Sequence, residues 1–192
     1  ILIGLVGSEM CIRDSYNIPP FYSGFIRTLR YFSFVLSIFL PGVYVAIGTF
    51  HQELIPTSML FTIAREEITT PYSLMTEALM LLILYEIMRE AGLRLPKAVG
   101  HAVSIIGGIV IGETTVSAGL IGAPMLVVIA LTAISSYVVS SLYESVSVLR
   151  FFFILIGGLT GMYGIILAAS VLCMNCLLYT SPSPTRPISI SY

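Results

Sequence analysis

Residues 28–50 read TLRYFSFVLSIFLPGVYVAIGTF, and this stretch decides the fold. After Arg30 it contains no charged residue for twenty positions, which is about the helix length that crosses the hydrocarbon core of a bilayer. Pro41-Gly42 lies in its middle. In a membrane helix such a pair marks a kink, because neighbouring helices can bond the backbone carbonyl that proline frees. The stretch therefore predicts a kinked transmembrane helix.

The composition of the whole chain agrees with a membrane location. Of 192 residues, 57% are hydrophobic and 10% are charged, and the mean hydropathy is +0.99. A soluble domain carries about a quarter charged residues, so lipid is the expected solvent for the excess apolar surface. The net charge of −1 gives no field that would attract nucleic acid. Cys173 and Cys176 follow an apolar helix without a second such pair, so neither a metal site nor a cofactor is expected.

Beyond the first span, the pattern predicts a polar segment and four more helices. Residues 51–70 are polar at both ends and too short in their apolar part to span, which indicates an interfacial or re-entrant segment. Thr70 and Pro71 are a good N-cap and first helical residue, and Gly92 is a typical stop. The predicted helices are 71–91, 96–112, 124–143 and 146–172. The fold class is all-α: a polytopic membrane helix bundle of about five transmembrane helices plus the short interfacial or re-entrant segment.

The basic residues predict the orientation. If the first span begins in the cytoplasm, six of the seven Lys and Arg residues between 16 and 172 lie inside, and Arg65 is the exception. This is the distribution that the positive-inside rule describes. We therefore expect the N-terminal side of the bundle to be cytoplasmic.

Small residues form stripes on two of the predicted helices. Ser104, Gly108 and Gly112 recur every four residues, and such a stripe lets another backbone approach closely or lines a narrow path. We favour packing over pore lining for this stripe. Gly157, Gly161 and Gly164 form a second set in the last helix. The polar, Gly-rich residues 113–124 are expected to break the helix that begins at Pro96.

Four blocks of sequence, in order and without large gaps over about 27–169, resemble the GerA family, the A subunits of spore germinant receptors. The first block joins residues 41–46, PGVYVA, to residues 50–57, FHQELIPT. The others are 89–96, REAGLRLP, running into 102–105, then 110–113 with 118–120 and 130–134, and finally 149–151. His101 and Ser140 depart from residues common in the family.

The resemblance implies a function and a set of partners. Such subunits lie in the inner membrane of a dormant spore, with a permease-like B subunit and a lipoprotein C subunit. They are thought to oligomerise into a nutrient-gated ion channel that releases cations and starts germination. Ligand recognition in the family is attributed largely to the B subunit, so the germinant is not predicted here.

The two ends of the chain differ from its middle. Residues 1–15 and 176–192 resemble translated adaptor sequence, and we set them aside as one would a fusion scar. We therefore expect a GerA-type transmembrane domain over 16–172 and an artefactual or disordered tail over 173–192. The soluble region that precedes the first span in family members would then be missing, as expected for a fragment.

The candidate functional residues are polar groups in or near predicted spans. A ring of Glu113, Thr114 and Thr115, one set per subunit, could select cations, but we slightly favour the alternative that Glu113 lies hydrated and inert at the outer interface. Glu77 lies in an apolar helix and must be protonated or paired, with Arg65 the obvious outer charge.

Two further polar groups have simpler interpretations. His51, Gln52 and Glu53 lack metal-site spacing and are expected to shape an outer vestibule. Glu86, Arg89 and Glu90 are expected to form a solvated cluster near the cytoplasmic face. No motif indicates an enzyme. A secondary transporter is the main alternative to a channel subunit, but no inverted repeat is found, and an intramembrane protease would need paired catalytic groups.

Overall fold

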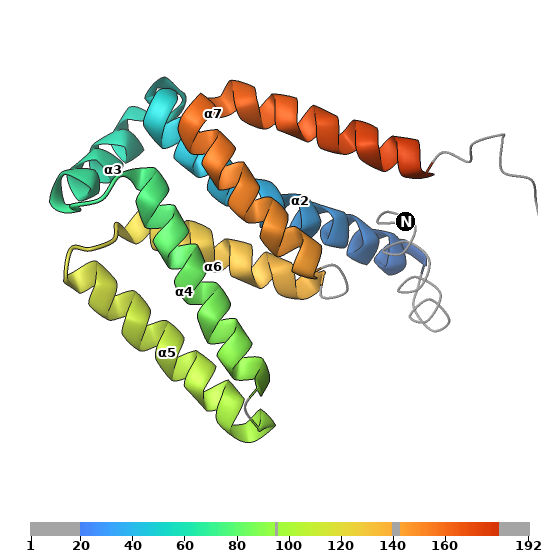
Figure 1. Cartoon of the computed structure of the whole chain (residues 1–192), viewed down its shortest axis with the longest axis horizontal. Helices are drawn as coiled ribbons and strands as arrows, with labels where there is room; N and C mark the ends of the chain where they lie inside the picture. The colour runs from blue at the N-terminus through green and yellow to red at the C-terminus, as the bar shows by residue number, and fades with distance from the viewer. Residues whose placement is uncertain (1–19, 95, 140–142, 181–192) are drawn as a thin grey trace, which may run out of the picture.

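The computed structural model describes residues 20–94, 96–139 and 143–180, and the termini expected to be artefactual lie largely outside these ranges. Within them the secondary structure is helical throughout, as predicted, with no strand. The helices, labelled as in Figure 1, are α2 Pro20–Phe50, η2 Gln52–Leu54, α3 Thr57–Thr69, α4 Leu74–Arg94, α5 Lys97–Ser117, α6 Ala123–Val138 and α7 Tyr143–Thr180.

Helices α2 and α7 pack against each other more extensively than any other pair of helices, and they lie side by side in Figure 1. Ile38, Ala46, Phe153 and Ile165 are buried between them. Their backbones touch at two glycines. A Cβ added at Gly42 would lie 2.8 Å from the carbonyl oxygen of Phe153, and one added at Gly157 would lie 2.5 Å from the carbonyl oxygen of Gly42.

Helix α7 folds back on itself, which differs from the single span predicted over 146–172. Gly161 has φ 69° and ψ −154°, a region that residues with a Cβ hardly adopt. From this point the two arms, 143–160 and 162–180, diverge in a V, the first running through the bundle and the second along its edge (Figure 1). The three glycines of the predicted stripe thus include one that sets a turn.

A second core joins α4 and α6 to α2 and α7. Val45, Leu82, Met125 and Ile154 are buried there, one from each of the four helices. Helix α5 packs mainly on α4 and lies at the edge of the bundle (Figure 1). Among its described side chains, Ile105, Ile109, Val110 and Glu113 are exposed.

Two described helices are long and apolar enough to cross a membrane. Their length and composition suggest that the chain is a membrane protein. The two helices are Phe21–Phe50 and Tyr143–Leu178, with mean hydropathies of 1.9 and 2.1. Ala123–Val138 is apolar but shorter. The predicted count of five spans is therefore not confirmed.

Several predicted boundaries are wrong by a few residues, for local reasons. Helix α4 begins at Leu74 rather than Pro71, because Thr70 instead closes α3 by donating its N–H to the Glu66 carbonyl at 3.2 Å. It also continues past Gly92 to Arg94, whose guanidinium pairs with Glu90 at 2.8 Å.

Helix α5 likewise extends further than predicted, to Ser117. The hydroxyls of Thr114 and Thr115 donate to the carbonyls of Val110 and Ile111, one turn back. These polar side chains are satisfied by their own helix, so they do not end it. The break comes at Gly119, which has φ 65°.

Candidate functional site

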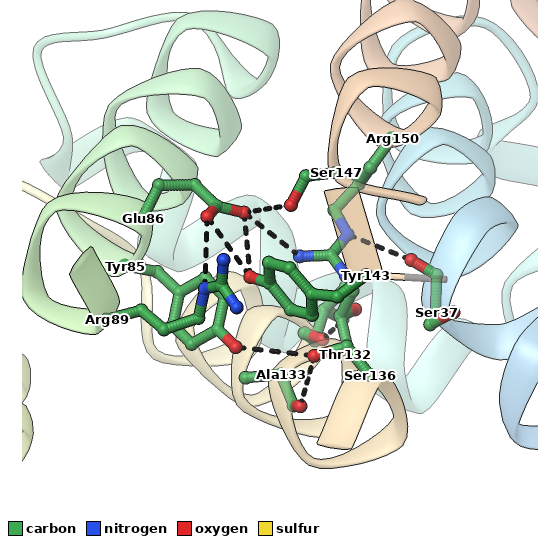
Figure 2. Close-up of polar contacts among 11 residues, drawn as sticks. Ser37, Tyr85, Glu86, Arg89, Thr132, Ala133, Ser136, Tyr143, Ser147 and Arg150 are labelled. Atoms are coloured by element: carbon green, nitrogen blue, oxygen red, sulfur yellow. Dashed lines mark hydrogen bonds and ion pairs between the residues drawn. The ribbon is translucent and has the colours of Figure 1, made fainter. Parts of the chain in front are cut away.

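The most polar part of the interior joins three helices. We call the residues Ser37, Glu86, Arg89, Tyr143, Ser147 and Arg150 the Glu86–Arg150 cluster (Figure 2). Helix α2 contributes Ser37, α4 contributes the acidic residue and Arg89, and α7 contributes the rest. Charged groups inside a membrane helix bundle are costly and usually functional, so this cluster is the first candidate site.

Arg150 anchors the cluster to α2. Its side chain is fully buried, and its Nε donates to the carbonyl oxygen of Ser37 at 2.9 Å. That carbonyl is one turn before Pro41, and proline has no N–H with which to bond it. Arg150 therefore replaces the missing helical hydrogen bond, which is the kind of compensation that the Pro41-Gly42 pair predicts.

Glu86 receives donors from α7. The hydroxyl of Tyr143 lies 3.0 and 3.1 Å from its two carboxylate oxygens, and the Ser147 hydroxyl also donates to it. The Nη1 atom of Arg150 lies further away, at 3.9 Å. The carboxylate is thus bonded by two hydroxyls and only loosely paired with the buried guanidinium.

Arg89 is the second cation of the cluster. Its Nε lies 3.6 Å from the Glu86 carboxylate, and its guanidinium lies 3.1 Å from the centre of the Tyr143 ring. The cluster therefore contains two guanidinium groups and one carboxylate. A formal excess of positive charge is held between α4 and α7, where tyrosine faces offer a cation–π contact.

A smaller polar layer links α4 to α6 beside this cluster (Figure 2). The Tyr85 and Ser136 hydroxyls lie 3.3 Å apart, and Ser136 also donates to the carbonyl of Ala133. Thr132 is fully buried and donates to the carbonyl of Val128. Each of these hydroxyls has a partner, so the layer adds packing specificity without an unsatisfied group.

The predicted solvated cluster on α4 is wrong for two of its three members. The side chains of Glu86 and Arg89 are only 22% and 21% exposed, whereas Glu90 forms an exposed pair with Arg94. The sequence holds one signal that could have found the site. Arg150 is the one charged residue within 146–172, and an isolated charge in a span needs a partner on another helix.

Glu77 is buried, and it bonds the α5–α6 connection. Its carboxylate accepts the backbone N–H of Gly122. Arg65, the partner predicted from its charge, has an exposed position on α3. The structure thus gives this carboxylate a backbone donor on the connection between α5 and α6.

The residues predicted to form the pore or a packing stripe on α5 are split between two environments. Gly112 is buried, and a Cβ added there would lie 3.4 Å from Leu126 of α6. Gly108 has nothing within 4 Å of such a Cβ, and Glu113 and Thr114 are exposed while Thr115 is half-buried. The side chain of Ser104 lies outside the described residues.

The predicted vestibule residues lie between α2 and α3. His51, Gln52 and Glu53 are exposed, and the Gln52 side chain donates to the Gly48 carbonyl at 2.9 Å. Within the described ranges, no group of three or more His, Cys, Asp or Glu side chains is placed to bind a metal ion.

Comparison with known proteins identifies the chain's relatives. A family model described as Bacillus/Clostridium GerA spore germination protein matches residues 8–183. Spore germination protein KA of Bacillus subtilis (strain 168) is 41% identical over 197 residues, covering 96% of this chain and 36% of that protein. Spore germination protein GerQA of Bacillus cereus is 39% identical, covering 91% and 37%.

A third relative, an uncharacterized membrane protein YfkQ of Bacillus subtilis (strain 168), is 39% identical over 80% of the chain. The chain spans about a third of the length of these curated relatives. No solved structure matches it significantly. The family match confirms the resemblance carried by the four sequence blocks: the chain belongs to the GerA family of spore germination proteins.

Proposed function

We propose that this chain is the membrane region of a spore germinant receptor subunit that oligomerises into a nutrient-gated ion channel. Its relatives are named spore germination proteins. The observation that carries the channel proposal is the exposed face of α5. Ile105, Ile109 and Glu113 are exposed there, and residues spaced i, i+4 and i+8 share one helical face. Gly108 lies beside this face, toward Gly112, and is also exposed. A face with an acidic end suits cation passage between subunits.

In this proposal α2, α4, α5, α6 and the first arm of α7 each cross the spore inner membrane once, and α2 begins on the cytoplasmic side. Close contacts between the helix ends support this arrangement, in which successive helices cross the membrane in opposite directions. Gly161 meets the ring of Phe50, and Gly122 meets Glu66 and Glu77, so the end of α2, the α7 turn and the α5–α6 connection share one end of the bundle. Arg89, Arg94 and Lys97 lie toward the other end, where the positive-inside rule expects the cytoplasm. A permease-like B subunit and a lipoprotein C subunit are the proposed partners.

Ion flux through liposomes containing the complete subunit tests the channel. We expect passive K⁺ flux, and we expect Gly108→Leu to reduce it strongly or to prevent assembly. The chain itself leaves space at Gly108, so the effect would arise between subunits rather than from misfolding of one. Gly24→Leu is the matched control, because Gly24 is also helical with nothing within 4 Å of an added Cβ.

Two results would contradict this proposal. Normal flux and assembly in Gly108→Leu would remove the α5 face from the pore and from the subunit interface. Saturable substrate exchange without passive conductance would instead support a secondary transporter.

A further inference from the structure

Arg150 is incompletely bonded in this structure. Within the described ranges, neither of its terminal nitrogens has a hydrogen-bond partner, although both are buried. Buried polar groups in native proteins nearly always have partners, and an unpaired buried charge is strongly unfavourable. The state described here therefore retains an unsatisfied guanidinium that another arrangement of the same residues could satisfy.

The group that could satisfy it is close by and is held by other donors. Glu86 lies 3.9 Å from Nη1 of Arg150, whereas a charge-assisted hydrogen bond is about 2.7–2.9 Å long. The hydroxyls of Tyr143 and Ser147 bond the same carboxylate. A displacement on the order of 1 Å would exchange these hydroxyls for the guanidinium.

The three α7 donors are arranged along one line. Tyr143, Ser147 and Arg150 are spaced i, i+4 and i+7, so they share one face of the helix. Glu86 meets this face from α4. If α4 slides along α7, the carboxylate passes from the hydroxyls to the guanidinium without leaving the face. Arg89 is one turn from Glu86 on α4, so it moves with it and leaves the Tyr143 ring.

We propose that Glu86 is a two-position latch between α4 and α7. In this structure the hydroxyls of Tyr143 and Ser147 hold its carboxylate, and during channel opening it passes to Arg150. Because Arg150 also bonds the Ser37 carbonyl freed by Pro41, the movement is transmitted to α2. This inference rests on the proposed channel function, but the position of the latch can be measured without ion flux.

The latch is tested by distances between spin labels on α4 and α7. Ile87→Cys and Val148→Cys provide exposed sites, at 60% and 71%, in the complete subunit with its native cysteines replaced by serine and in lipid nanodiscs. The variant Tyr143→Phe/Ser147→Ala removes both competing hydroxyls and keeps both charges. We expect the mean distance between the labels to shift by about 1 Å from its value in the parent protein, since two hydrogen bonds to a charged group then no longer oppose the transfer.

Two further variants separate the latch from loosened packing. Adding Glu86→Gln should restore the parental mean distance, because a neutral amide gains little from the guanidinium. Thr160→Val/Ser170→Ala removes two other α7 hydroxyls, which bond carbonyls of their own helix, and should leave the distances unchanged. An unaltered distribution in Tyr143→Phe/Ser147→Ala, or a shift that persists with Glu86→Gln, would overturn the latch.

Flux measurements on the same variants test the link to opening. In liposomes, Tyr143→Phe/Ser147→Ala should raise unstimulated K⁺ flux several-fold, and Glu86→Gln should reverse the rise. A distance shift with parental flux would overturn the coupling to opening. If the parent protein itself conducts no ions, the channel proposal fails, while the distance measurements still decide whether Glu86 moves.

Discussion

At the scale of single residues, one proline accounts for the position of a buried arginine. Pro41 leaves the Ser37 carbonyl without its helical donor, and Arg150 supplies one from another helix at 2.9 Å. A kink residue in α2 and a charge in α7 are therefore parts of one arrangement. Their dependence on each other can be measured as a coupling energy.

We expect Arg150→Met to lower the free energy of unfolding by about 3 kcal/mol, because it leaves the Ser37 carbonyl unbonded and Glu86 without its nearest buried cation. In a Pro41→Ala background the same substitution should cost about 1 kcal/mol less, since the restored N–H bonds that carbonyl. Thermal unfolding in detergent measures both costs. Pro71→Ala, a substitution outside any helix, is the control background and should leave the cost of Arg150→Met unchanged.

Glu77 gives a second prediction at this scale. Glu77→Leu removes the acceptor of the buried Gly122 N–H and should destabilise the protein by about 1–3 kcal/mol. Glu77→Gln keeps an acceptor oxygen at the same place and should cost clearly less. Equal unfolding temperatures for the two variants would show that the bond to Gly122 contributes nothing to stability.

At the scale of elements, glycine determines how α7 packs. Gly157 lets its backbone touch α2, and Gly161 turns the helix at a positive φ with the Phe50 ring 3.1 Å from an added Cβ. These two requirements differ physically. The first concerns space alone, whereas the second also concerns backbone conformation.

We therefore expect Gly161→Ala to cost about 1–3 kcal/mol from backbone strain alone. Gly108→Ala is the matched control, because Gly108 is helical and open, and alanine there should be neutral or stabilising by up to about 1 kcal/mol. Unfolding midpoints of the two variants in detergent provide the comparison. A tolerated alanine at 161 would mean that α7 is straight in the membrane.

At the scale of the whole molecule, the fold of α7 changes the expected topology. Each arm has about the length that crosses a bilayer core, since a helix rises 1.5 Å per residue. If both arms cross, residue 178 returns to the side on which α7 begins. A single span over 146–172 would instead place it on the opposite side.

Labelling with a membrane-impermeant maleimide distinguishes these topologies. Glu144→Cys and Leu178→Cys, both at exposed positions, should react from the same side of sealed vesicles in a background without native cysteines. Glu53→Cys, near the opposite end of the bundle, should react from the other side. Reaction of positions 144 and 178 from opposite sides would contradict the folded arrangement of α7.

Much of this protein follows from its sequence by itself. The uncharged run after Arg30, the high hydropathy and the ordered blocks determine the helical class, the membrane setting and the family, because each depends on local composition or on residue identity. Local sequence likewise determines which segments with strong apolar runs form helices. The ends of α4 and α5, at Leu74, Arg94 and Ser117, depend in addition on particular hydrogen bonds.

The tertiary structure alone decided which polar residues meet. The sequence predicts a solvated Glu86 beside Arg89 and Glu90, and only the packing of α4 against α7 leaves it half-buried near Arg150. The same holds for Glu77 with Gly122 and for the turn at Gly161. Glu77 and Gly122 are 45 positions apart, and Arg150 and the Ser37 carbonyl that it bonds are 113 positions apart. No local pattern encodes such pairs, because they depend on how whole helices are placed against one another.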